Sequence, residues 1–182
     1  MKNKLYTLLL LVGVSSLTIA QNVDFKRSNF KDDAEEFKAV ESAIKEANGF
    51  FDLGSASIFE VKSPEQNFKK ALQRYERAQK LNPNNGLNNF RIGVCHIYSS
   101  SPYKASPFIK KAIELDPECD PFLQYYNGYV LQLEQDFDGA LKAYKKFEEG
   151  YKKADNFSKF VGMREKECQN AKKAVSAPER VW

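Results

Sequence analysis

The sequence contains few of the residues on which enzyme chemistry usually depends. It has a single histidine, His96, among 182 residues, so a Ser-His-Asp or Cys-His device would have to use it. His96 falls within a predicted helix beside Cys95, and adjacent helical side chains diverge by about 100°, out of mutual reach. The chain also lacks a glycine-rich phosphate loop, a zinc-binding HExxH motif and a GxSxG nucleophile motif. We therefore expect no enzyme activity and no cofactor.

Long hydrophobic runs are absent after the first 20 residues. The chain begins with a basic segment, continues with an apolar run at Leu5–Val14 and then reaches Thr18-Ile19-Ala20. A basic start, a short apolar core and a small-x-small ending are typical of a secretory signal peptide. The run is shorter than the roughly 20 residues needed to cross a bilayer. We expect cleavage between Ala20 and Gln21, export of the remainder, and no transmembrane span in the mature chain.

Cysteine is scarce, and its spacing does not favour a metal site. Cys95, Cys119 and Cys168 could join His96 in a tetrahedral zinc site, but such sites use closely paired ligands that this sequence lacks. An exported chain can form disulfides, and a Cys95–Cys119 bridge is one alternative. We favour three reduced thiols that pack as small apolar residues.

Neither sign of charge dominates. The chain has 28 basic and 24 acidic residues, a net charge of +4 that falls to +2 without Lys2 and Lys4. The C-terminal region is the most basic, but its lysines alternate with Glu165 and Glu167, which favours a solvated helix face. A nucleic-acid-binding domain would need a clustered basic face. We expect neither a nucleic-acid partner nor a small-molecule substrate.

What the sequence does contain is an internal repeat. A motif of two alanines, one larger residue and a proline recurs with identical spacing after 34 residues, and two glycines lie 35 residues apart. Small residues mark close helix crossings, and proline ends a helix because it has no backbone donor. A period of this length is typical of stacked helix pairs. The sequence therefore predicts an all-α fold with these repeat-packing residues: Ala71, Tyr75, Ala78, Pro83, Gly93, Ala105, Ile109, Ala112, Pro117, Gly128, Ala140 and Tyr144.

This pattern resembles the tetratricopeptide repeat (TPR). Residues 86–119 look like one complete repeat, and His96 departs from the family by standing where a tyrosine or another large residue is usual. The resemblance implies a right-handed superhelix of antiparallel helix pairs. It also implies a concave groove, lined by the first helix of each pair, that grips a peptide or a partner domain.

A narrower resemblance covers about residues 30–180. Residues 88–117 and 127–147 are similar to the N-terminal TPR module of large Bacteroidetes envelope proteins of the OmpA family. Those proteins continue into a β-propeller and a peptidoglycan-binding domain, as in components of type IX secretion and gliding. The resemblance implies a periplasmic or outer-membrane-associated location. Because the further domains are absent from this sequence, we expect either a fragment of a longer protein or a stand-alone adaptor.

The expected organisation follows the repeats. We predict a signal peptide at 1–20, a flexible leader at 21–32, a helical domain at 33–175 and a linker or truncated end at 176–182. Within the domain the repeats occupy about 33–85, 86–119 and 120–154, and 157–175 forms a capping helix. Asp138 is expected to cap the helix of the third repeat. The first repeat carries an insertion at 52–63, whose apolar Ile58, Phe59 and Val61 either pack on the first helices or, alternatively, contact a partner.

Function is therefore expected to come from a surface. The resemblance places these partner-binding positions on the concave groove: Phe90, Val94, Ile97, Tyr98, Tyr125, Tyr129 and Gln132. Tyrosine supplies a large contact area with a polar tip, which suits an interface. We expect an exported, non-enzymatic scaffold that docks a protein partner. The alternative is a periplasmic, chaperone-like holder of extended client peptides.

Overall fold

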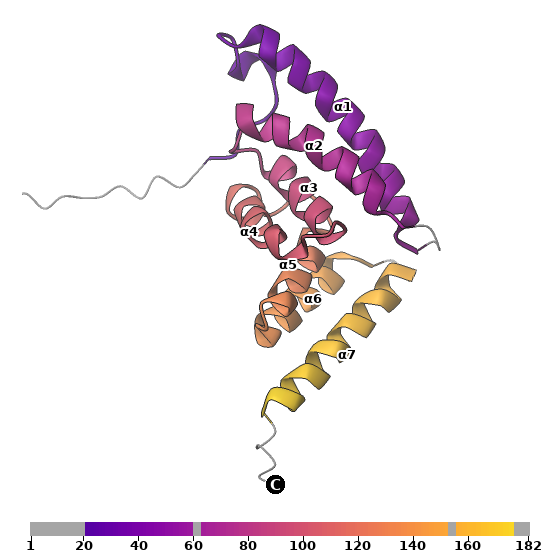
Figure 1. Cartoon of the computed structure of the whole chain (residues 1–182). Helices are drawn as coiled ribbons and strands as arrows, with labels where there is room; N and C mark the ends of the chain where they lie inside the picture. Colours follow the sequence, from indigo (N-terminus) through magenta and orange to yellow (C-terminus); the bar gives the residue numbers. More distant parts are fainter. Residues whose placement is uncertain (1–20, 60–62, 153–155, 177–182) are drawn as a thin grey trace, which may run out of the picture.

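The computed structural model describes residues 21–59, 63–152 and 156–176 (Figure 1). The predicted signal peptide with its cleavage site after Ala20, and the predicted end at 177–182, lie outside the described residues. Within the described ranges the chain forms seven α-helices and three short 3-10 helices, without strands. The helices are α1 (Ala34–Ala56), α2 (Glu65–Leu81), α3 (Gly86–Ile97), α4 (Ala105–Leu115), α5 (Leu123–Leu133), α6 (Phe137–Gly150) and α7 (Asn156–Ser176). The predicted all-α fold is confirmed.

The helices pack as sequential antiparallel pairs. α1 packs with α2, α3 with α4 and α5 with α6, and each pair stacks on the next through α2 with α3 and α4 with α5. α7, drawn in yellow in Figure 1, packs against α6 and α5 at the end of the stack. One buried apolar cluster runs through the whole stack, from Ala47 in α1 to Cys168 in α7.

The repeat-packing residues lie where the two helices of a pair cross. A Cβ built on Gly93 would lie 2.6 Å from Ile109 Cδ1, and one built on Gly128 would lie 2.5 Å from Tyr144 Cε1. The glycine and its partner are separated by 16 residues in both pairs, as the repeat requires. Burial is confirmed for the alanines and for Tyr75: Ala71, Tyr75, Ala78, Ala105, Ala112 and Ala140 are fully buried. Pro83 and Pro117 each follow the last residue of a second helix by two positions.

The first helix pair differs from the expectation. α1 has 23 residues against 12 in α3, so it continues through Ala56 into the predicted insertion before the 3-10 helix η2 (Ser57–Phe59) begins. Gly54 makes the close approach in this pair: its ideal Cβ would lie 3.0 Å from the Phe68 ring, while the other glycine of α1, Gly49, has nothing within 4 Å. Ile58 is half-buried against the core. The predicted apolar side chains of Phe59 and Val61 lie outside the described part.

Residues 21–32, predicted to be a flexible leader, dock on the stack instead. Val23 donates its N–H to the carbonyl of Asn84 at 2.7 Å, and its own carbonyl accepts from Asn82 Nδ2 at 2.7 Å and from Asn85 Nδ2 at 2.9 Å. The Gly86 N–H donates to Asn22 Oδ1 at 2.9 Å. The leader is thus tied to the turn between α2 and α3.

The start of α6 also corrects a prediction. Asp136, not Asp138, is the N-cap: its Oδ1 accepts from the Gly139 N–H at 2.9 Å. Asp138 lies in the first turn and pairs with Lys172 of α7 at 2.5 Å. The shift follows from the preceding turn, where Gln135 adopts a left-handed φ of 65° and leaves Asp136 as the last non-helical residue.

Candidate functional site

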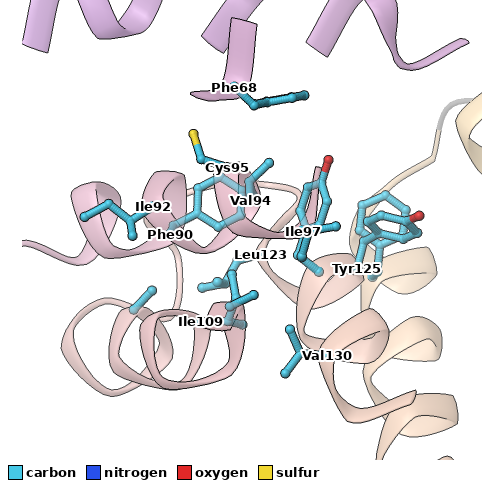
Figure 2. Close-up of a cluster of buried hydrophobic side chains, with 14 of the residues drawn as sticks. Phe68, Phe90, Ile92, Val94, Cys95, Ile97, Ile109, Leu123, Tyr125 and Val130 are labelled. Atoms are coloured by element: carbon cyan, nitrogen blue, oxygen red, sulfur yellow. The ribbon is translucent and has the colours of Figure 1, made fainter. Parts of the chain in front are cut away.

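Four of the seven predicted groove residues are buried. The exposed fractions are 1% for Phe90, 0% for Val94, 8% for Ile97 and 1% for Tyr125. Figure 2 shows Phe90, Val94 and Ile97 gathered with other apolar side chains of the buried cluster. The expectation that these residues lie exposed along an open groove is therefore wrong. They form the packing between successive helix pairs.

The other three predicted groove residues are half-buried and already have partners. Tyr98 stacks on Phe68 with ring centroids 4.8 Å apart. Gln132 Oε1 accepts from the Tyr144 hydroxyl at 2.9 Å. The Arg164 guanidinium of α7 lies 4.6 Å from the Tyr129 ring centroid.

These contacts explain why the predicted strip is not open. α7 packs chiefly on α6 and also contacts α5, where its Arg164 covers Tyr129. Phe68 of α2 covers Tyr98, and Tyr144 of α6 holds Gln132. Tyr98, Tyr129 and Gln132 hold helices together in this chain. None of them projects from the surface as an isolated anchor.

An open hollow does exist nearby, between alternate helices of the stack. A cavity of about 370 Å³ is lined by side chains from the end of α1 and η2, from α3, from the start of α5 and from the start of α7. Its apolar wall consists of Phe51, Ile58, Phe90, Phe122, Tyr126 and Phe157. Its polar members are Asp52, Ser55, Arg91 and Asp120. We call this hollow the aromatic cavity.

Local structure holds the far wall of the aromatic cavity in place. Asp120 Oδ1 accepts the Phe122 N–H at 2.9 Å, which fixes the turn that begins α5. The Phe122 ring then meets Phe157 of α7 at 4.7 Å between centroids. Across α3, Phe90 meets Tyr126 edge to face at 5.8 Å. Aromatic pairs at these separations are stabilising beyond the area that they bury.

The near wall depends on the length of α1. Phe51 and Asp52 lie in its last turns, and Ser55 and Ile58 lie within the segment predicted as an insertion. A first helix as short as α3 would end before these positions. The insertion that distinguishes the first repeat therefore builds one side of the cavity.

Charge in the aromatic cavity is unbalanced. Asp52 and Asp120 face one guanidinium, Arg91. Burial raises the pKa of Asp120, and the Phe122 N–H and the charge of Arg91 oppose that rise only in part. Among the described residues, no hydrogen bond reaches Asp120 Oδ2.

Arg91 stands between the aromatic cavity and a second hollow. Its Nη1 donates to Asn48 Oδ1, and its guanidinium lies 5.7 Å from the Phe51 ring and 5.8 Å from the Tyr75 ring. Its Nε has no hydrogen-bond partner in the described structure. Arg91 is therefore directed to α1 and α2 and forms a wall of the aromatic cavity.

The second hollow, of about 470 Å³, is polar and lies against the docked leader. Asn22, Asn85, Asn88 and Asp116 contribute to its lining, together with Arg91. The buried Asn88 Oδ1 has no hydrogen-bond donor in the described structure. Asn85 Nδ2 donates to the Val23 carbonyl and Asn22 Nδ2 donates to Asp116 Oδ2 at 3.3 Å, so the hollow adjoins the leader's docking site.

The environments of His96 and of the three cysteines disfavour the charged forms of these side chains. His96 lies against Phe108 with ring centroids 5.5 Å apart, and burial lowers its pKa. Burial raises the pKa of all three cysteine thiols, to about 12 for Cys119. The thiolate is the nucleophilic form of cysteine, so these environments oppose reactivity. All three thiols are unpaired; Cys95 and Cys168 are buried, while Cys119 is only half-buried.

Searches place the chain in no named family. No protein-family model matches it, and no curated protein sequence matches it. The fold defines it as an all-helical protein of seven packed helices in the described ranges. No helix in those ranges is long and apolar enough to cross a bilayer.

Sequence reasoning missed most of the aromatic cavity. Phe90 was predicted to bind a partner and lines the cavity, but Arg91, Asp120, Phe122 and Phe157 were not predicted as site residues. The available signal was the apolar insertion, since Ile58 lies in the cavity wall. The alternative that the insertion contacts a partner is compatible with this position and stays a prediction.

Proposed function

We propose that this chain is a non-enzymatic scaffold of the TPR type that docks a protein partner in the aromatic cavity. The observation that carries the proposal is the cavity's lining: aromatic rings and an aliphatic side chain from alternate helices of the stack surround about 370 Å³ of open space. Binding sites are typically concave, mostly apolar and furnished with a few polar groups. The repeated glycine and alanine contacts between paired helices support the TPR assignment.

The proposed location is the bacterial envelope. The sequence of residues 1–20 supports export, and the narrower resemblance favours a periplasmic or outer-membrane-associated assembly, linked to type IX secretion or to peptidoglycan anchoring. Intact mass of the chain recovered from a periplasmic fraction tests export. We expect a chain that begins at Gln21. A membrane-bound species that keeps residues 1–20 would contradict export.

The docking proposal is tested by site-specific photo-crosslinking in envelope extract from cells that produce the chain. A benzophenone amino acid replaces Ile58, which lines the aromatic cavity, or Tyr103, which is 73% exposed in the 3-10 helix between α3 and α4. We expect a discrete crosslinked partner from position 58 and much less from position 103. Equal capture at both positions, or capture at position 103 alone, would overturn the proposal.

The same experiment distinguishes the chaperone-like alternative. A scaffold yields one crosslinked partner at a defined mass and stoichiometry. A holder of extended clients yields many unrelated masses from position 58. The second result would keep the cavity as the binding site and replace the scaffold function by client holding.

A further inference from the structure

We propose that the aromatic cavity receives the cationic side chain of a lysine or arginine from an extended segment of the partner. The inference rests on the proposed function, because it specifies the chemistry of a ligand at the same site. Two carboxylates and several aromatic rings line one hollow and face one guanidinium that is already engaged elsewhere. A positive group is the ligand that completes this arrangement.

The rings supply the first half of the recognition. Phe51 comes from α1, Phe122 from the start of α5 and Phe157 from α7, and the last two rings pack together with centroids 4.7 Å apart. A cation near the face of an aromatic ring is attracted by the ring's quadrupole, and the attraction grows when water is excluded. The aliphatic stem of a lysine or arginine packs on apolar surface at the same time.

Asp120 supplies the second half. One of its oxygens, Oδ1, is used by the Phe122 N–H, and no described residue donates to the other. The carboxylate is half-buried, and burial raises its pKa because Arg91 and the Phe122 N–H offset the desolvation only in part. A ligand ammonium or guanidinium beside Oδ2 would offset the remainder. Asp52, which is exposed on the opposite wall, adds attraction for the same charge.

An anionic ligand is the competing possibility, because Arg91 also lines the cavity. Arg91 donates to Asn48 Oδ1 and lies over the rings of Phe51 and Tyr75, so its charge is directed away from the opening. An incoming carboxylate would also meet Asp52 and Asp120 in the same hollow, and like charges at close range repel. The net formal charge of the lining is therefore complementary to a cation.

The volume supports a side chain rather than a large ligand. At about 370 Å³ the cavity is near the lower end of the range of roughly 300–1,000 Å³ typical of small-molecule sites. One long side chain fits within such a space, and the adjoining backbone would remain at the surface. An extended segment of a partner protein meets this requirement.

Three peptides of the form acetyl-Ala-Leu-Xaa-Leu-Ala-amide, with lysine, norleucine or glutamate at Xaa, test the inference. Each is titrated into the full ¹⁵N-labelled chain, and chemical-shift changes report both affinity and position. We expect the lysine peptide to shift the amides of Phe51, Asp52 and Asp120, and to bind about tenfold more tightly than the norleucine peptide. The glutamate peptide should bind most weakly. Added salt should reduce the advantage of lysine, because it screens exposed charges.

Variants separate charge from shape. Asp120→Asn keeps an oxygen for the Phe122 N–H while removing the charge, and it should weaken the lysine peptide about fivefold to tenfold without changing the norleucine peptide. Glu118→Gln is the matched control: it removes one charge from an exposed residue outside the cavity and should leave both affinities unchanged.

The outcomes distinguish this inference from the proposed function. Equal binding of the lysine and norleucine peptides at the cavity overturns cation recognition and leaves the docking site standing. If the glutamate peptide binds more tightly than the lysine peptide, and Arg91→Gln abolishes that binding, the cavity recognises an anion and not a cation. If no peptide shifts the cavity amides, cation recognition fails, and crosslinking at position 58 decides separately whether the docking function fails with it.

Discussion

Gly128 lies where α5 crosses α6, with the Tyr144 ring directly against its backbone. Tyr144 has little room to move, because the ring is buried and its hydroxyl donates to Gln132 Oε1 at 2.9 Å. Gly93 has the same relation to Ile109 in the preceding pair. Neither glycine has a positive φ, so backbone conformation does not require glycine at either position. The close approach of the two helices of each pair does.

The first prediction concerns this contact. Gly128→Ala places a Cβ 2.5 Å from Tyr144 Cε1 and should destabilise the chain by about 1–3 kcal/mol through overpacking. Gly162→Ala is the matched control, because that helical glycine in α7 has nothing within 4 Å. It should stabilise by about 0.5–1 kcal/mol, as alanine favours helix. Urea unfolding measures both, and shifts of the midpoint in the same direction would contradict the packing.

The second prediction concerns His96, the chain's single histidine. Burial lowers its pKa, helped by Lys104 and opposed by Glu76, so the unfolded chain binds a proton more readily than the folded one. The stability associated with neutral His96 is therefore present above the unfolded pKa of about 6.5 and is lost as pH falls below it.

Urea unfolding at pH 7.5, 6.5 and 5.5 tests this dependence. We expect the difference in unfolding free energy between the native chain and His96→Gln to change in favour of the variant as pH falls. The imidazole C2 proton resonance gives the folded pKa directly, without ambiguity from other histidines. A folded pKa at or above about 6.5 would contradict the expected effect of burial.

Residue spacing predicted the buried contacts well and the exposed ones poorly. A 34-residue period identifies small residues that recur at crossings, so Ala105 and Gly128 could be placed from sequence. Helical periodicity also indicates that Phe90 and Tyr125 face neighbouring helices. It does not indicate which neighbour covers them: Phe160 of α7 lies against Tyr125, and Tyr126 of α5 lies against Phe90.

At the scale of elements, the leader and the long α1 distinguish this stack from a simple repeat array. The leader is polar and without periodicity, so nothing in its pattern signalled docking. Its attachment comes from asparagine amides around the α2–α3 turn, and side-chain hydrogen bonds of this kind depend on tertiary position. The extension of α1 was not predicted either: residues 52–63 were interpreted as an insertion, yet α1 continues to Ala56 and its Gly54 faces the Phe68 ring.

The third prediction tests the docked leader. Asn82 is buried, and its Nδ2 donates to the Val23 carbonyl at 2.7 Å. Asn82→Ala should destabilise the chain by about 1–2 kcal/mol and speed exchange of the Val23 amide, which donates to the Asn84 carbonyl. Hydrogen exchange measured by NMR reports that amide. Asn170→Ala, an exposed change on α7, should alter neither quantity by much, and unchanged Val23 exchange in Asn82→Ala would refute the docking role.

At the scale of the whole molecule, each helix pair is stabilised chiefly by its neighbours in the stack. Such proteins need a terminal element that covers the last apolar face. α7 meets this need here, since Val161 and Cys168 are fully buried and Phe157 meets Tyr125 with centroids 4.8 Å apart. α7 spans Asn156–Ser176, and the capping helix was predicted at 157–175. A cap was expected there because no further repeat follows this helix in the sequence.

The last prediction follows from this arrangement. A chain that stops after Lys152 lacks α7 and leaves Tyr125, Phe122 and Phe147 without the helix that covers them. Newly exposed aromatic surface of this kind favours association. We expect a lower urea midpoint and concentration-dependent oligomers in light scattering after size-exclusion chromatography.

The control is the full chain with Met163→Ser and Val175→Ser, which removes exposed apolar side chains of α7 but uncovers nothing. It should remain as stable and as monodisperse as the native chain. A truncated chain with an unchanged midpoint and no added self-association would show that α6 already closes the stack, and that α7 contributes chiefly its wall of the aromatic cavity.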